Sequence, residues 1–124
     1  MIKLVFAIRR RPGMSREEFQ RYWREEHAAL VSRHADELRI RRYVQTHARD
    51  TDLDEALAGT RGSEPRFYDG VAELWWDSME DLIAASTSEA GQAAGRELVE
   101  DEQRFIDLPR SPLWLGEENV VIDR

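Results

Sequence analysis

The stretch SREEFQRYWREEHAALVSRH, residues 15–34, decides the fold because it carries the clearest helix signal in the chain. Ser15 is followed three residues later by Glu18, a spacing that predicts a capping box at the start of a helix. Apolar side chains then recur at helical spacing, which predicts one buried face formed by Phe19, Trp23, Leu30 and Val31. We therefore expect a long amphipathic helix packed against the rest of the domain.

A histidine lies on this apolar face. His27 comes one turn after Trp23 and one turn before Val31, so its ring should be at least partly buried. One interpretation is a core histidine whose ring nitrogens are satisfied by neighbouring groups. The other is a proton donor or acceptor in a cavity between this helix and a sheet. The helix pattern alone leaves both interpretations open.

The segments on either side of this helix predict an α+β domain. Apolar runs bounded by turn residues predict strands over residues 2–8, 39–48, 67–76 and 113–122. Further helices are predicted over 79–85, with a capping box of Asp77 and Glu80, and over about 88–106. The order strand, helix, strand, strand, helix, strand predicts a ferredoxin-like sandwich with a four-stranded antiparallel sheet. At 124 residues, a single domain is expected.

Three other regions lead to predictions about surfaces. Helices would cover one sheet face only, and Val5, Val71 and Trp75 would leave the other face too apolar for water. A homodimer that packs two sheets face to face is therefore expected. Residues 50–66 are rich in turn formers, with one or two helical turns around 53–57, and are interpreted as a functional flap. Arg9, Arg10 and Arg11 are interpreted as a solvated strand end rather than an anion site, since no glycine-rich loop accompanies them.

Composition excludes several classes of function. The net charge of −7 disfavours non-specific nucleic-acid binding and anionic membrane surfaces. The chain has no cysteine, so thiolate chemistry and disulfides are ruled out. His34 lies two turns from His27, too far to share a metal ion, and no dinucleotide or phosphate-loop motif occurs. We therefore expect no metal and no cofactor. No segment is apolar enough to span a bilayer, which predicts a cytoplasmic soluble protein.

Four segments in the same order resemble the EthD-domain family of the dimeric α/β-barrel superfamily: RRPGMSREEFQRYWREEHAALV (10–31), RRYVQTH (41–47), YDGVAELWWDSMEDL (68–82) and DEQRFIDLPRSPLWLGEENVVI (101–122). The resemblance implies a ferredoxin-like protomer, a barrel-forming dimer and a small-molecule pocket between sheet and helices. Family members are linked to degradation of ether compounds, and relatives to dehydration or cyclisation of aromatic polyketides. Similar barrels include cofactor-free monooxygenases.

The resemblance also implies a candidate site. His27 matches the histidine of the family and is the leading candidate for proton transfer, because a neutral imidazole can accept a proton from a phenol or an activated C–H group. His47 and Tyr43 are the candidates for polarising or orienting the substrate. The residues expected to contact an apolar aromatic or ether-type compound are Trp23, Val31, Trp76 and Trp114. For the tryptophans, a role confined to core packing stays open.

Two classes of function therefore remain, besides a purely structural dimer whose interior has no pocket. The first is a cofactor-free enzyme, of the monooxygenase or of the dehydratase and cyclase type, in which His27 moves a proton. The second is a non-catalytic protein that binds a small ligand in the same pocket. The sequence does not choose between them, because a fold can host either.

Overall fold

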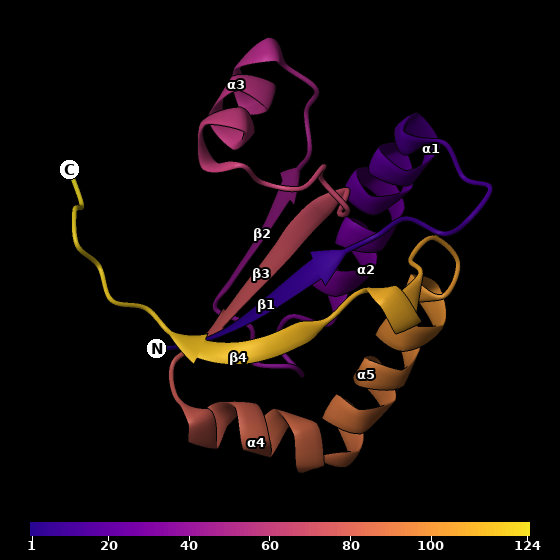
Figure 1. Ribbon diagram of the computed structural model, residues 1–124. Coiled ribbons are helices and arrows are strands. Elements are labelled where there is room, and N and C mark those ends of the chain that lie inside the picture. Colours follow the sequence, from indigo (N-terminus) through magenta and orange to yellow (C-terminus); the bar gives the residue numbers. More distant parts are fainter.

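Four antiparallel strands form one sheet in the computed structural model of the protein, which describes residues 1–124. The central strand β1 (Ile2–Ile8) pairs with β3 (Gly70–Trp76) on one side and with β4 (Leu113–Glu117) on the other. β2 (Arg42–His47) pairs with β3 at the edge, so the strand order is β2-β3-β1-β4 (Figure 1). This topology confirms the predicted ferredoxin-like α+β fold.

The predicted long helix forms as three consecutive segments. They are α1 (Arg16–Arg21), the π-helical η1 (Tyr22–His27) and α2 (Ala28–Arg33). The Ser15 hydroxyl accepts a hydrogen bond from the backbone N–H of Glu18 at 3.1 Å, so the helix begins where the sequence predicts. The π-helical turn was not predicted. It carries both Trp23 and His27, and such widened turns are frequent at functional sites.

The core lies between the sheet and this helix. Phe6, Ile8 and Ala72 of the sheet form one buried cluster with side chains of the helical layer, namely Phe19, Trp23, Phe105 and Ile106. The remaining helices are α4 (Met79–Thr87), α5 (Glu89–Glu102) and the short 3-10 turn η2 (Leu108–Arg110). α5 ends before the predicted residue 106 because Phe105 turns into the core and its carbonyl accepts a hydrogen bond from Arg11 at 2.8 Å.

Two element ends differ from the prediction for identifiable reasons. The residue that caps α4 is Ser78, whose hydroxyl accepts from the Asp81 backbone at 3.1 Å, and not Asp77. The last strand ends at Glu117 rather than at residue 122, because Glu117 pairs with Ile2 and β1 offers only Met1 beyond that point. The residues that follow, Val120, Val121 and Ile122, form an exposed tail that leads away from the sheet (Figure 1).

Residues 50–66 contain more helix than predicted. α3 (Asp52–Arg61) has ten residues, begins with a capping box of Thr51 and Asp54, and buries none of its side chains. It stands beyond the end of β2, apart from the other helices (Figure 1). Because α3 has no apolar contact face, its signal in the sequence was confined to its cap and its local propensity.

The sheet face without helices is more polar than predicted. Trp75 is only 6% exposed, because the ammonium group of Lys3 and the guanidinium of Arg42 lie 4.9 and 4.8 Å from its ring. Lys3 also forms an ion pair with Glu73. The apolar side chain that is most accessible on this face is Trp114, which pairs with Val5 and is 51% exposed. No helix of the structure has the combined length and apolarity that a membrane crossing requires.

Candidate functional site

His27 is held by a buried carboxylate from α5. Its Nδ1 lies 2.7 Å from Oδ2 of Asp101, and the two residues are 5% and 6% exposed. The other oxygen of Asp101 accepts hydrogen bonds from the Tyr22 hydroxyl at 2.5 Å and from Arg104 at 3.0 Å. Burial raises the pKa of Asp101, but the hydrogen bonds from Tyr22, His27 and Arg104 outweigh it and hold the pKa below its usual value. Asp101 is therefore ionised near neutral pH.

This carboxylate selects the tautomer of His27. Burial lowers the pKa of His27, and the contact with Asp101 opposes that shift only in part, so the ring is neutral at pH 7. An ionised Asp101 can only accept, and Nδ1 must therefore carry the ring proton. The lone pair is consequently on Nε2, which is the arrangement that a general base requires.

A second carboxyl group faces that nitrogen. Oε2 of Glu102 lies 3.9 Å from Nε2 of His27, which is longer than a hydrogen bond. Burial, together with the charge of Asp101, raises the pKa of Glu102 to about 7. Burial also raises the pKa of Tyr43, to which the charge of Glu102 contributes, so these groups belong to one electrostatic cluster. Glu102 is thus partly protonated near neutral pH.

Glu102→Gln should remove a pH dependence of stability. The pKa of Glu102 is raised from 4.5 to about 7 on folding, so its contribution is fully present below pH 4.5 and is lost as the pH rises through 7. That loss amounts to about 3 kcal/mol. His27 contributes with the opposite sign, since its lowered pKa costs stability as the pH falls. Urea unfolding at pH 5 and pH 8 measures the effect, and an equal pH response in wild type and variant would contradict it.

A second cluster of polar side chains comes from β2 and consists of Tyr43, Gln45 and His47. The Gln45 amide nitrogen donates to the Tyr43 hydroxyl and to the Trp23 carbonyl, both at 2.9 Å. Its amide oxygen lies 2.8 Å from Nε2 of His47, whose ring centroid is 4.4 Å from that of Trp23. Nδ1 of His47 is buried without a hydrogen-bond partner. Burial lowers the pKa of His47, as does the nearby charge of Arg24. The structure thus brings Tyr43, His47 and Trp23 together through Gln45.

The other proposed contact residues lie elsewhere. Val31 is 3% exposed in α2, one turn after His27. Trp76 is buried and donates its indole N–H to the Leu38 carbonyl at 2.7 Å. Trp114 pairs with Val5, whose side chain is on the sheet face opposite Phe6 and the core, so it does not face His27 within one protomer.

No large cavity adjoins His27 in this structure. None of the five main cavities is lined by His27, Tyr43 or His47. Aromatic side chains fill the expected space, because Trp23 is fully buried and the Phe105 ring centroid lies 5.0 Å from that of His27. The structure also contains no group of three or more histidine or carboxylate side chains placed to hold a metal ion.

Sequence reasoning missed Asp101 and Glu102. The available signal was that Asp101 precedes the core residue Phe105 by four positions, which would place both on one face of the helix predicted over 88–106. An acidic residue on a buried stripe marks a candidate partner for another buried polar group, as His27 does on the first helix.

The model of the EthD domain matches residues 11–109, which is well over half of the chain. The chain belongs to the EthD family. A relative from Metarhizium robertsii, named conidial pigment biosynthesis dehydratase EthD, is 28% identical over 118 residues, covering 94% of this chain and 81% of the relative. These matches confirm the resemblance found in the sequence.

The fold of this EthD-family chain is the same as that of several solved structures of other proteins. An ethyl tert-butyl ether D family protein from Bacillus halodurans superposes with a TM-score of 0.62 at 19% identity, covering 96% of this chain and 100% of that one. A dimeric protein of unknown function with a ferredoxin-like fold, from Bacteroides fragilis, superposes with a TM-score of 0.58 at 11% identity, covering 94% and 95%. At these identities the similarity concerns the fold alone.

Proposed function

We propose that this EthD-family protein is a small-molecule enzyme in which His27 transfers a proton, and that its reaction is a dehydration of a hydroxylated aromatic or partly aromatic ketone. The observation that carries the proposal is the 2.7 Å contact between Nδ1 of His27 and the ionised Asp101, which leaves Nε2 free as a base. The relative named as a dehydratase supports the choice of reaction. Oxygenation and cyclisation of related compounds begin with the same proton abstraction.

The proposed reaction balances with groups of this chain. Nε2 of His27 removes a proton from the carbon next to the carbonyl, and the C–O bond to the neighbouring hydroxyl then breaks as a C=C bond forms. The leaving hydroxyl takes a proton and departs as water. Glu102 is the acid for that step, because its pKa of about 7 keeps a proton available near neutral pH. The Tyr43 hydroxyl polarises the carbonyl.

Access to His27 is part of the proposal. Glu102 is the acidic side chain next to Nε2, and 18% of its side chain is exposed. A small shift of this side chain, which keeps its carboxyl group beside the substrate, would open a path to Nε2 and leave Glu102 in place as the acid.

Hydrogen–deuterium exchange tests the proton-transfer step without knowledge of the natural substrate. We expect the wild type to accelerate exchange of the acidic C1 protons of 2-tetralone in D2O, and His27→Gln to reduce that acceleration by about 10²–10⁴-fold. His34→Gln is the matched control, because His34 lies at the end of α2 with its partners on the protein surface. Exchange at the wild-type rate by a folded His27→Gln protein would refute the proposal.

A binding protein without catalysis is the second candidate. The observation that favours it is that His27 is 5% exposed and lines none of the main cavities. This candidate predicts saturable binding of 2-tetralone with no acceleration of exchange. It also predicts that His27→Gln binds as tightly as the wild type.

The protein is also proposed to form a homodimer through the sheet face that carries Trp114. Trp114 is 51% exposed, and the tail residues Val121 and Ile122 are 83% and 71% exposed. Light scattering at micromolar concentration should give twice the protomer mass of 14.5 kDa. Trp114→Glu should yield monomers. Val99→Glu, at a side chain 47% exposed on α5, should leave the dimer intact, and monomeric wild type would disprove the proposal.

A further inference from the structure

An arginine-rich cavity lies at the end of the sheet where β1 leads into α1. It has a volume of about 590 Å³, within the range of small-ligand sites. Its lining contains two aspartates, Asp69 and Asp107, and six arginines, Arg9, Arg10, Arg11, Arg16, Arg66 and Arg110. The lining therefore carries an excess of positive charge in a chain whose net charge is −7. It contains neither His27 nor any other residue of the proposed proton-transfer site.

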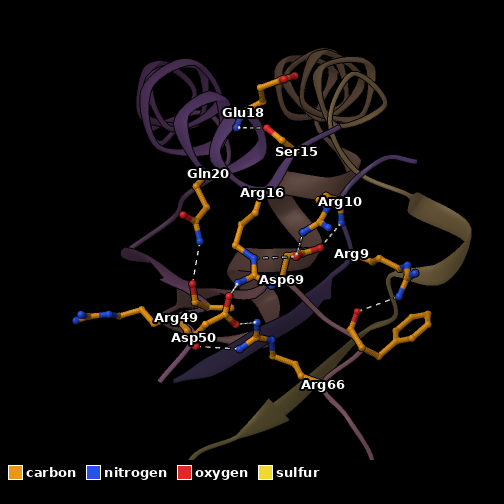
Figure 2. A network of polar contacts seen from close by, with 12 residues as sticks. Arg9, Arg10, Ser15, Arg16, Glu18, Gln20, Arg49, Asp50, Arg66 and Asp69 are labelled. Atoms are coloured by element: carbon orange, nitrogen blue, oxygen red, sulfur yellow. Dashed lines mark hydrogen bonds and ion pairs between the residues drawn. The ribbon is translucent and has the colours of Figure 1, made fainter. Parts of the chain in front are cut away.

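Part of this charge is neutralised inside the protein. Arg10 donates from its backbone and its side chain to the buried Asp69, at 2.9 and 2.8 Å. Arg16 and Arg66 converge on Asp50 at 2.5 and 2.7 Å, as Figure 2 shows. The contacts of Arg10 correct the interpretation of residues 9–11 as a merely solvated strand end at that position, whereas Arg11 is exposed as expected. The contacts with Asp69 and Asp50 place arginines from different segments around this one cavity.

Three arginine side chains of the cavity have guanidinium donors that no acceptor of the protein uses. Arg11 is exposed and forms no ion pair, and the side chain of Arg9 donates only to the Phe67 carbonyl, at 3.1 Å, while its backbone N–H donates to the Ser111 hydroxyl. Nε of Arg16 is buried without a hydrogen bond, its closest carboxylate contact being 3.6 Å from Asp69. Unused guanidinium donors around one cavity, one of them buried, are groups that an anionic ligand could bind.

Aromatic groups form one wall of this cavity. The Arg9 guanidinium lies 3.9 Å from the centroid of the Phe67 ring, which is 46% exposed. Tyr68 packs edge-on against Phe67 at 5.1 Å. A guanidinium that rests on an accessible aromatic ring presents its donor edge beside an apolar surface. This combination matches a ligand that has both a carboxylate and an aromatic ring.

We propose that this cavity binds an aromatic carboxylic acid. The carboxylate is held by Arg9 and Arg11, with the buried Nε of Arg16 as a further donor, and the ring lies against Phe67 and Tyr68. Bidentate pairing of a guanidinium with a carboxylate fixes the orientation of the acid. The site goes beyond the proposed proton-transfer function and does not depend on His27.

Calorimetric titration with 1-naphthoate tests this site, with the neutral 1-naphthamide as the matched ligand. We expect naphthoate to bind and naphthamide to bind at least ten-fold more weakly. Arg9→Gln combined with Arg11→Gln should weaken naphthoate binding by at least ten-fold, since two charge-assisted contacts are lost. Arg33→Gln combined with Arg96→Gln removes the same charge from α2 and α5 and should change the affinity by less than two-fold.

Two further measurements make the outcome decisive. Amide shifts in 1H–15N spectra should change at residues 9–16 and 66–69 on addition of naphthoate, and His27→Gln should bind it like the wild type. Equal binding of naphthamide and naphthoate, or equal affinity of the Arg9 and Arg11 double variant and the wild type, would overturn the proposal. Loss of binding in His27→Gln would instead place the acid in the proton-transfer site and would also overturn it.

Discussion

Asp101→Asn should move the ring proton of His27 from Nδ1 to Nε2. The Tyr22 hydroxyl and Arg104 both donate to Oδ1 of Asp101, whereas His27 contacts Oδ2. In the asparagine variant, the single side-chain oxygen stays with the two donors, and the amide nitrogen replaces Oδ2. That nitrogen can only donate, so Nδ1 of His27 must accept and Nε2 must carry the proton.

The expected consequence is a large loss of proton transfer with a modest change in stability. A protonated Nε2 cannot act as a base, so the exchange of 2-tetralone protons should fall by about 10²–10⁴-fold. The loss of charge-assisted hydrogen bonds should cost about 1–3 kcal/mol of unfolding free energy. The 15N shifts of the imidazole nitrogens report the tautomer directly and need no substrate. A change of tautomer in these shifts would show that Asp101 positions the ring proton of His27, whereas a purely structural role of Asp101 would change the stability alone.

Tyr22→Phe is the matched control for this prediction. It removes one hydrogen bond from Oδ1 of Asp101 and leaves the contact between Oδ2 and His27 in place. The tautomer should therefore stay as in the wild type, and exchange should fall by no more than about ten-fold. An Asp101→Asn protein that keeps its proton on Nδ1 would disprove the assignment of Asp101 as the residue that selects the tautomer.

The first helix was predictable because its signals are local. The cap at Ser15 and the apolar stripe through Phe19 and Trp23 are encoded within one segment, and the structure reproduces both. The π-helical turn around His27 has no comparable pattern in the sequence. It leaves the backbone N–H of Ala28 bonded to the Trp23 carbonyl, five residues back.

The candidate site was only half visible for a related reason. His27 stands out because it lies on an apolar stripe, but its partner Asp101 is 74 positions away. Their contact depends on how α5 crosses the first helix, which no local pattern reports. The same holds for β4, whose length is set by the start of β1, and for the arginine cavity, whose donors come from three segments. Pairings of this kind are decided by the tertiary fold.

Gly91→Ala should destabilise the protein strongly at the corner between α4 and α5. Ser88 ends α4 and caps α5, and its hydroxyl accepts a hydrogen bond from the Gly91 backbone at 3.0 Å. A Cβ atom at position 91 would lie 1.7 Å from the backbone carbonyl oxygen of Ala85. A carbonyl within α4 cannot move away as a flexible side chain could, so the two helices must separate. We expect a loss of about 3 kcal/mol in unfolding free energy.

Gly95 provides the matched control on the same helix, one turn further on. A Cβ atom there meets nothing within 4 Å, so Gly95→Ala should raise the unfolding free energy by about 0.5–1 kcal/mol through better helix propensity. Urea unfolding at pH 7 measures both variants, and their opposite signs separate a steric effect from a general effect of glycine. Because α5 also carries Asp101 and Glu102, the separation of the helices should weaken the hold on His27. A Gly91→Ala protein as stable as Gly95→Ala would contradict this close packing of the corner.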